Sequence, residues 1–526
     1  MTSTDGGPEQ YIRTDHLEGD IEGRSVRGGA ITSVAQVAKS LLTVGSTLVL
    51  ARLLTPEDFG LVAMVTAVTG FLSMFKDMGL SMVTVQREEI SQAQISALFW
   101  INAALGLVIT VALAALSWGL AWFYQQPEVM GVAIVLALSF MVDGLTVQHE
   151  ALMRRQMRYR ALAIAEVVSV AAGVAAAVIL AWQGFSYWAL VANLVVFSAV
   201  NLVAIWIACP WRPAAPGRTD QMWELLRFGA NITGFSFVNY FARNLDDVLI
   251  GRFHGANELG LYQKAYEILM VPITQINRPA SRVAIPALSR LADDESRYRR
   301  AYLRILEKLL LVTMPVGALL ILASDWVVLV ILGDQWVDAA LIFAALGVSI
   351  FAQAIGNTTG WLFISQDRTD EMFRWGFIGA GTALFSFVIG LPWGALGVAV
   401  AYSAVGVLVR TPWLLWFVGR RGPVMTLDFY RVAWPGLVAA LGSAAAVGIL
   451  RWATIFEVSV VNLIISIPLA AVGALALTCA YGRGRAVLVD GWRLLRHLRR
   501  AGEDDDELDE ALLEESSQEK GEDHRI

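Results

Sequence analysis

Apolar residues form a series of long runs between residues 28 and 481, and short polar stretches separate the runs. A helix needs about 20 mostly apolar residues to cross a bilayer. Fourteen runs come near or exceed this length, so the sequence predicts an all-α integral membrane protein with about fourteen transmembrane helices. The predicted spans cover residues 28–52, 58–84, 94–118, 128–149, 160–182, 184–209, 222–250, 257–285, 300–322, 339–365, 372–391, 394–419, 431–451 and 457–481.

Lysine and arginine are distributed unevenly over the predicted loops. Every second loop carries a basic cluster, and the N-terminal stretch and residues 483–500 fall on that same side. The opposite loops carry few basic residues, namely Arg52, Arg252, Lys264 and Arg451. Because basic loops stay in the cytoplasm, we expect both termini there and an even number of spans. The expected location is the cytoplasmic (inner) cell membrane, as a multi-pass protein.

The composition agrees with a membrane protein. Hydrophobic residues make up 56% of the 526 residues and charged residues only 16%, against about a quarter charged in soluble domains. Many of the acidic residues lie in a tail after residue 502, so the rest of the chain is net basic although the whole chain has a net charge of −6. Cys209 and Cys479 are too few for a disulfide framework, and we expect them to be unreactive thiols.

The chain also repeats itself. Three pairs of segments match in order, namely 50–61 with 250–261, 152–158 with 362–368, and 197–200 with 402–405. The nearly constant offset indicates two related halves of six helices each. Six is an even number, so the halves enter the membrane from the same side, as two parallel lobes about an axis along the membrane normal. Coincidence among apolar sequences is the alternative explanation.

These patterns predict the organisation of the whole chain. It comprises a cytoplasmic N-terminal segment (1–27), an N-lobe of helices 1–6 (28–209), a cytoplasmic linker (210–221), a C-lobe of helices 7–12 (222–419), helices 13–14 (431–481), a basic amphipathic surface helix (483–500) and a disordered acidic tail (501–526). Arginines interleaved with apolar residues suit the surface helix to anionic headgroups. The acidic tail is too polar to build a core.

Polar side chains recur at helical spacing in the first span of each half. They are Gln36 and Lys39 in the first span and Asn239, Arg243, Asp246 and Asp247 in the seventh. Ionisable groups in hydrocarbon are costly, so two such stripes favour a hydrophilic cavity between the lobes. Lys39 and Arg243 suit a phosphate or carboxylate ligand, and with Gln36 and Asn239 they are the substrate-binding candidates. The alternatives are an Arg243–Asp246 pair that only docks helices and a Lys39 that reaches toward headgroups.

Acidic residues in the spans are candidates for coupling transport to an ion. Asp246 and Asp247 can neutralise Arg243, or they can carry a proton or Na⁺. Asp143 lies in the span next to that of Glu166, and the two can pair or relay protons. A purely structural role is the alternative for each of these carboxylates.

The eighth predicted span contains two further candidates. Glu267 is a possible ion-coupling residue and Arg278 a possible substrate-binding residue. Both lie close to Pro272 or Pro279, and prolines loosen backbone bonding in a spanning helix. The prolines suit either a hinge in a moving lobe or a static kink.

Sequence signatures of soluble enzymes are absent. The chain has no phosphate-binding loop, no His-Glu-x-x-His or paired Cys-x-x-Cys metal motif and no Gly-x-Ser-x-Gly nucleophile elbow. We therefore expect no enzymatic activity, no catalytic residue, no metal site and no cofactor. Transport is then driven by an H⁺ or Na⁺ gradient, by the membrane potential or by consumption of the product. No nucleic-acid partner is expected.

Two motifs carry a family resemblance. The stretch from Arg243 to Tyr262 and its first-half counterpart from Ala51 to Gly60 resemble the signatures of Wzx-type polysaccharide exporters. The resemblance spans roughly residues 25–480 and is nearest to colanic-acid, succinoglycan and teichuronic-acid exporters. These proteins belong to the multidrug/oligosaccharidyl-lipid/polysaccharide exporter superfamily.

The resemblance implies a flippase for undecaprenyl-pyrophosphate-linked oligosaccharide units, working by alternating access in lipopolysaccharide or exopolysaccharide biosynthesis. Cavity cations bind the anionic headgroup in that family, which implies this role for Arg243 and Lys39. Asp246 matches the acidic position of the motif, whereas Asp247 stands where the pattern often has Asn. The implied partners are the lipid-linked glycan, the bilayer, and a polymerase and other polysaccharide-assembly proteins.

Two other functions fit the same fold or pathway. An ion-coupled multidrug or other small-molecule extruder would need a more acidic and apolar cavity, and Lys39 and Arg243 argue against it. A membrane enzyme such as a polymerase or ligase is expected to need a large external loop, and the longest one here, at about 323–338, is short.

Overall fold

The structure is a computed structural model of the chain. It describes residue 12 and residues 21–77, 79–87, 89–215, 222–454, 458–481 and 484–485, and for residues 21–26 and 222–243 it describes the backbone alone. Every regular element in these ranges is a helix, so the predicted all-α class is confirmed. The predicted surface helix lies almost wholly outside the described residues, and the acidic tail lies outside them entirely.

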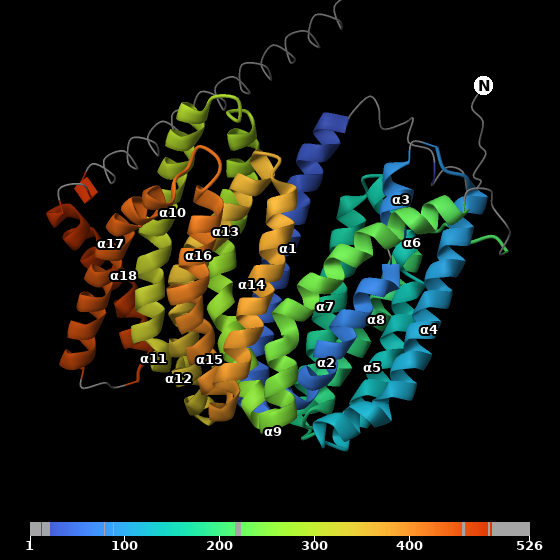
Figure 1. Cartoon of the computed structure of the whole chain (residues 1–526). Coiled ribbons are helices and arrows are strands. Elements are labelled where there is room, and N and C mark those ends of the chain that lie inside the picture. The colour runs from blue at the N-terminus through green and yellow to red at the C-terminus, as the bar shows by residue number, and fades with distance from the viewer. Residues whose placement is uncertain are drawn as a thin grey trace, which may run out of the picture. The chain divides into compact units, whose positions relative to one another are not determined.

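The helices follow one another through short turns (Figure 1). The first half contains α1 (Ile21–Leu53), α2 (Pro56–Asp77), α3 (Leu80–Gln86), α4 (Gln92–Tyr124), α5 (Glu128–Gly144), α6 (Val147–Arg155), α7 (Tyr159–Trp182) and α8 (Trp188–Ala208). The second half contains α9 (Met222–Ser289), α10 (Glu295–Leu322), α11 (Ser324–Leu332), η3 (Asp334–Trp336), α12 (Val337–Gly347), α13 (Ser349–Ser365), α14 (Thr369–Gly390), η4 (Leu391–Trp393), α15 (Gly394–Val405), η5 (Gly406–Arg410) and α16 (Thr411–Gly419). The chain then continues through α17 (Thr426–Ala453) and α18 (Val460–Ala480).

The long element α9 consists of two helices that meet at a sharp turn. Gly255 in its middle has a φ of 84°, a conformation that glycine adopts without steric cost. The turn brings the hydroxyl of Tyr262 to 2.8 Å from Asp246 Oδ2, sixteen residues away in sequence. Those residues would span about 24 Å in a straight helix. The chain therefore reverses direction at Gly255, and the parts of the predicted spans 222–250 and 257–285 next to it form a helical hairpin.

Ten helices of the described chain are long and apolar enough to cross a membrane. Asp334–Gly347 and Ser349–Ser365 pass the same test together, across a bend of 46°. One of the ten, Thr369–Gly419, contains a turn at Gly394, where φ is 72°. The polar α9 hairpin is not among the ten. A polytopic membrane protein is thus confirmed, and the number of fourteen crossings stays a prediction.

The backbone of the first half recurs in the second. Positive φ angles occur at Gln125, Met157 and Gly184, and again at Gly333, Asp367 and Gly394. In the pair Met157 and Asp367 the turn is the same in detail, because the next N–H donates to a carbonyl five residues earlier, at 2.9 and 2.8 Å. This bond is typical of a helix that ends in a left-handed residue. These matching turns agree with the internal repeat predicted from the sequence, and the two six-helix halves stay a prediction.

The chain divides into two compact units. Unit 1 contains Met1–Leu269, Val327–Leu346 and Phe373–Gly406, and unit 2 contains Met270–Trp326, Gly347–Met372 and Val407–Ile526. The predicted N-lobe lies wholly in unit 1, whereas residues of the predicted C-lobe occur in both units. The lobe boundaries at 28–209 and 222–419 therefore stay a prediction.

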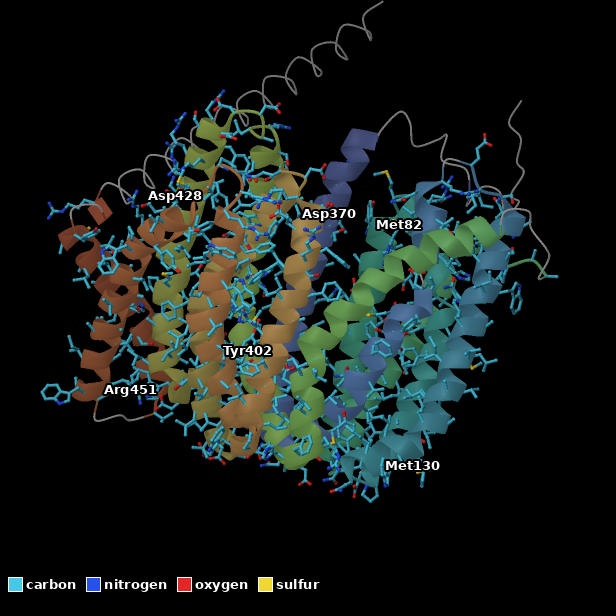
Figure 2. All side chains as sticks on the ribbon, in the orientation of Figure 1. Met82, Met130, Asp370, Tyr402, Asp428 and Arg451 are labelled. Carbon is cyan, nitrogen blue, oxygen red and sulfur yellow. The ribbon has the colours of Figure 1, made fainter. Side chains whose placement is uncertain are left out.

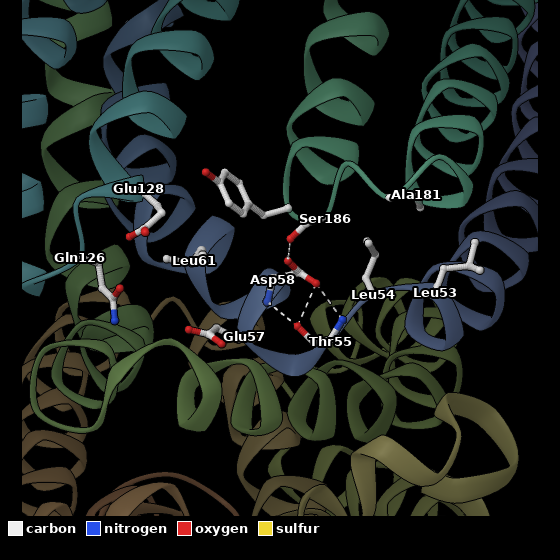
Figure 3. A pocket seen from close by; sticks show the side chains of 12 residues that line it. Leu53, Leu54, Thr55, Glu57, Asp58, Leu61, Gln126, Glu128, Ala181 and Ser186 are labelled. Carbon is white, nitrogen blue, oxygen red and sulfur yellow. Dashed lines mark hydrogen bonds between the residues drawn. The ribbon is translucent and has the colours of Figure 1, made fainter.

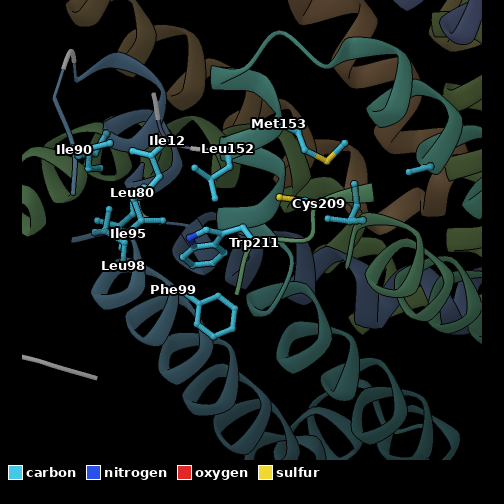
Figure 4. Packing of buried hydrophobic residues seen from close by; sticks show 13 residues of the cluster. Ile12, Leu80, Ile90, Ile95, Leu98, Phe99, Leu152, Met153, Cys209 and Trp211 are labelled. Atoms are coloured by element: carbon cyan, nitrogen blue, oxygen red, sulfur yellow. The ribbon is translucent and has the colours of Figure 1, made fainter. Parts of the chain in front are cut away.

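In unit 1, a cluster of buried apolar residues joins α3, α4, α6 and the segment after α8. Leu80, Phe99, Leu152 and Trp211 contribute large side chains to it (Figure 4). Cys209 lies in the same cluster, and burial raises the pKa of its thiol. A thiol with a raised pKa forms little thiolate, which supports the expectation that Cys209 is unreactive.

In unit 2, two bidentate ion pairs hold α17 to neighbouring helices. Arg299 on α10 donates to Asp428 at 2.9 and 2.6 Å. Near the other end of α17, Arg451 donates to Asp325 at 2.6 and 2.8 Å. Asp428 and Arg451 lie far apart along α17 (Figure 2). Bidentate pairs fix geometry as well as charge, so α17 is attached at both ends.

Candidate functional site

A cavity of about 440 Å³ opens among the helices of unit 1. We call it the polar pocket. It is lined by Thr32, Ala35, Gln36, Lys76, Asp143, Thr146, Glu150, Arg154, Tyr159, Leu162, Ala163, Glu166, Phe197, Asn201 and Ile205. These residues come from α1, α2 and α5–α8, together with the turn between α5 and α6. Because α1 contributes Thr32 and Gln36, the pocket lies next to the middle of that helix.

A lysine–glutamate pair connects α1 to α7 at this pocket. Lys39 Nζ donates to Glu166 Oε1. The lysine side chain is 22% exposed and the glutamate 47%, so the pair faces open space rather than a dry interior. The candidate cation Lys39 is therefore neutralised by a carboxylate of its own unit.

A second pair connects α2 to α5. Lys76 Nζ donates to Asp143 Oδ2 at 2.9 Å, and both side chains are about one-quarter exposed. A pair or a proton relay between Asp143 and Glu166 was one of two alternatives from the sequence, and the structure gives each of these carboxylates its own lysine. The two pairs leave no net charge on these four groups.

The third carboxylate of the pocket is Glu150. It accepts a hydrogen bond from the amide of Asn201 at 3.1 Å, and Arg154 lies one helical turn away at 3.4 Å. An ion pair at this spacing contributes little to stability. It does balance the charge of Glu150, so every carboxylate that lines the pocket has a cation beside it.

A chain of hydrogen bonds between buried polar groups ends at the backbone of Lys76, which lines the pocket. Thr84 donates to Gln148 at 2.7 Å, Gln148 donates to Asn102 at 2.9 Å, and Asn102 donates to the carbonyl of Lys76 at 3.1 Å. Gln148 and Asn102 are completely buried. Fully satisfied networks of this kind rigidify a core, so this chain fixes the backbone that carries Lys76.

The α9 hairpin holds the other acidic candidates. Asp246 is only 9% exposed; its Oδ2 accepts the Tyr262 hydroxyl, and its Oδ1 has no partner among the described atoms. Asp247 is partly buried beside it. Glu267 pairs with Lys264 at 2.6 Å, and Lys264 also lies 4.5 Å from the ring centroid of Phe59. The ring and the carboxylate together account for the position of Lys264.

In unit 2, α9 continues with two exposed arginines one turn apart, Arg278 and Arg282. In the part of the chain that the structure describes, neither guanidinium has a hydrogen bond or ion pair to a protein group. Unpaired guanidinium groups are suited to bind phosphate oxygens.

The predicted site residues therefore fall into three groups. Gln36, Lys39 and Asp143 come together at the polar pocket. Asp246, Asp247 and Glu267 lie on the α9 hairpin, and Arg278 lies on its continuation in unit 2. The side chains of Asn239 and Arg243 lie outside the described residues.

Sequence reasoning missed several residues that line the polar pocket. Lys76 pairs with Asp143 rather than with the adjacent Asp77, which accepts hydrogen bonds from Ser81. Asn201 gave no signal, because it is an uncharged amide inside the apolar run of α8. Only the spacing of Glu150 and Arg154, four residues apart, could have indicated their interaction.

A second cavity of about 450 Å³ lies at the turn between α1 and α2, and we call it the turn-end pocket (Figure 3). Asp58 is its central carboxylate. It accepts from the Thr55 N–H and hydroxyl, both at 2.8 Å, and from the Ser186 hydroxyl. The repeat-related Glu258 similarly accepts from the Ala395 N–H at 3.0 Å. Both carboxylates therefore hold helix starts in place and are not free to bind a ligand.

The same turns contact each other through glycine. A Cβ on Gly60 would overlap the carbonyl of Ala256, and a Cβ on Gly260 would overlap the carbonyl of Pro56. Positions 56 and 60 are related to 256 and 260 by the offset of 200. The two contacts are thus copies of one another, and the repeat explains why glycine occurs at both positions.

Comparisons with known proteins agree with this architecture. A family model described as polysaccharide biosynthesis protein matches residues 49–341, more than half of the chain. The teichuronic acid biosynthesis protein TuaB of Bacillus subtilis (strain 168) is 27% identical over 429 residues, covering 80% of this chain and 88% of TuaB. The lipopolysaccharide biosynthesis protein WzxC of Escherichia coli (strain K12) is 26% identical over 392 residues, which cover 73% of this chain and 79% of WzxC.

Among solved structures, the lipid II flippase MurJ in its inward closed conformation is similar, with a TM-score of 0.68. The match covers 86% of this chain and 98% of MurJ at 14% sequence identity. At this identity the likeness concerns the fold alone. It confirms that this arrangement of helices is one that membrane transporters use.

Proposed function

The chain belongs to the polysaccharide biosynthesis protein family, and from this we propose that it translocates undecaprenyl-pyrophosphate-linked oligosaccharide units across the cytoplasmic membrane. The relatives and the flippase fold support transport of a lipid-linked saccharide. The carrier lipid, the pyrophosphate and the alternating-access cycle belong to the proposal.

The ion pairs within apolar spans are the observation that carries the proposal. Lys39–Glu166 and Lys76–Asp143 lie in helices that are otherwise apolar enough to cross a membrane. Charged groups at such places line water-filled paths rather than contact lipid. A polar pocket of this kind gives a saccharide a route that avoids hydrocarbon.

We assign the anionic headgroup to arginines of the second half. Arg278 and Arg282 are exposed on one face of α9, and two guanidinium groups one turn apart can both contact a pyrophosphate. Arg243 remains a third candidate from the sequence. Lys39 contributes less than expected, because Glu166 already neutralises it.

For energy coupling we propose H⁺ or Na⁺ at the α9 hairpin. One oxygen of Asp246 has no partner among the described atoms, and Asp246 lies next to Asp247. A cation or proton would relieve the repulsion between the two carboxylates. The proposal also places both termini in the cytoplasm and includes a polymerase and other assembly proteins as partners.

The test is a strain that lacks this gene. Without the protein, surface polysaccharide is lost and undecaprenyl-linked saccharide units accumulate inside the cell. Wild-type protein restores export. Unchanged surface polysaccharide together with no accumulation would refute the proposed function.

The same strain tests the headgroup assignment. The double substitution Arg278→Ala/Arg282→Ala is expected to lower export more than about tenfold, because losing charge-assisted hydrogen bonds costs more than 1.4 kcal/mol. Arg290→Ala, which alters an exposed arginine just after α9, is the matched control and leaves export unchanged. Normal export by the double variant at normal protein level would remove these arginines from the site.

A further inference from the structure

The charges of the polar pocket cancel one another. Its three carboxylates, Asp143, Glu150 and Glu166, each lie beside a cation. Gln36 is different, because its side chain is exposed at the pocket and has no hydrogen bond to any described protein group. Among the residues that the structure describes, the pocket therefore offers amides and paired charges but no free cation.

We propose that the polar pocket is a subsite for an uncharged sugar of the lipid-linked saccharide, with Gln36 as a residue that determines specificity. This inference rests on the proposed function. It assigns the sugar to the polar pocket, whose lining residues all lie in unit 1.

The chemistry of the pocket distinguishes a sugar from a phosphate. A phosphate would meet three carboxylates whose counter-charges are already engaged, and like charges repel. A sugar hydroxyl both donates and accepts hydrogen bonds, as does the Gln36 amide. Ion-paired carboxylates such as Glu150 still have lone pairs that can accept from hydroxyls.

The size and the walls of the pocket agree with this ligand. Its volume of about 440 Å³ falls within the range of about 300–1,000 Å³ typical of small-molecule sites. Tyr159 and Phe197 contribute ring surfaces to the lining. A sugar has apolar C–H faces as well as hydroxyls, so a mixed wall of rings and amides complements it.

The first experiment compares two probes on purified full-length protein in lipid nanodiscs. One probe is a short-chain polyprenyl pyrophosphate, and the other is the same lipid carrying one glucose. Gln36→Leu is expected to weaken binding of the glucosyl probe about tenfold, the equivalent of one or two hydrogen bonds. Its affinity for the sugar-free probe is expected to stay at the wild-type value.

Two control variants sharpen this comparison. Gln126→Leu removes an amide from the turn-end pocket, at the other end of α1, and should affect neither probe. Arg278→Ala should weaken both probes equally, because both carry the pyrophosphate. A Gln36→Leu protein that binds both probes like the wild type, or loses both equally, would overturn the subsite.

A second measurement does not depend on how well the leucine variant folds. Thr32 lines the same pocket, is exposed and lies one turn before Gln36. In a Cys479→Ser background, a Thr32→Cys protein is treated with a maleimide. The glucosyl probe should slow alkylation and the sugar-free probe should not; equal protection by both, or none by either, contradicts the subsite.

The two proposals can fail separately. If wild-type protein binds neither probe, the proposed function fails and takes the subsite with it. If it binds both probes equally tightly and Gln36→Leu changes nothing, the lipid-linked substrate stands and only the sugar subsite is lost.

Discussion

The two halves of this chain have matching backbone turns, but their charged residues differ in the partners that they have. In the first half, Lys39 and Lys76 are each neutralised by a carboxylate from another helix. In the second half, Lys264 pairs with Glu267, but Arg278 and Arg282 have no protein partner among the described residues, and Asp246 accepts a hydrogen bond from the Tyr262 hydroxyl. A duplicated fold therefore provides one balanced pocket and one set of available charges.

The largest expected effect concerns the balanced half. Lys76→Ala leaves Asp143 without a counter-charge in a partly buried place. Removing one partner of a fully buried pair costs about 3–5 kcal/mol, and since both groups are about one-quarter exposed we expect about 2–3 kcal/mol here. The loss is measured as a lower melting temperature in detergent, followed by tryptophan fluorescence.

The matched control removes both charges at once. Lys76→Met/Asp143→Leu replaces the pair by apolar side chains of similar size, which is often neutral for stability. We expect its melting temperature to lie close to that of the wild type. A double variant as unstable as Lys76→Ala would show that the pair does more than balance charge, and the contrast between the halves would weaken.

Some of these features could be predicted from the sequence and others could not. The spans and the repeat could be predicted because burial in lipid and helical periodicity leave local patterns. The candidates Gln36, Lys39 and Asp143 were singled out as polar groups in apolar runs, and the structure brings them together at the polar pocket.

The partners of these groups could not be predicted. Lys39 meets Glu166 across 127 residues and Lys76 meets Asp143 across 67. Which helix faces which depends on packing of the whole unit, and no local pattern encodes it. The network of Thr84, Gln148 and Asn102 behind the pocket was missed for the same reason.

The next prediction tests whether the halves are equivalent where their turns meet. Gly60→Ala and Gly260→Ala each place a methyl group on a backbone carbonyl of the other turn. Overpacking of this kind typically costs about 1–3 kcal/mol, and the two contacts are copies, so both variants should lose about 1–2 kcal/mol. Their melting temperatures in detergent provide the measurement.

Gly29→Ala and Gly45→Ala are the controls for this pair, because a Cβ at either position meets no other group within 4 Å. Both lie in α1, where alanine is a better helix former than glycine, so neither should lower the melting temperature. A large loss for Gly60→Ala with none for Gly260→Ala would mean that the two turns are not equivalent.

The smallest expected effect concerns two residues that share a backbone conformation but differ in side chain. Met157 and Asp367 occupy the same left-handed position, with φ of 53° and 54°. This conformation costs most residues about 1–2 kcal/mol, whereas Asp tolerates it through local hydrogen bonds. Glycine removes the strain but gains entropy in the unfolded chain, which offsets about 0.5–1 kcal/mol.

Met157→Gly should therefore raise stability by up to about 1 kcal/mol, and Asp367→Gly should change it little. Equal gains at both positions would show that the aspartate is as strained as the methionine, and the divergence of the halves would then be limited to the charged pockets.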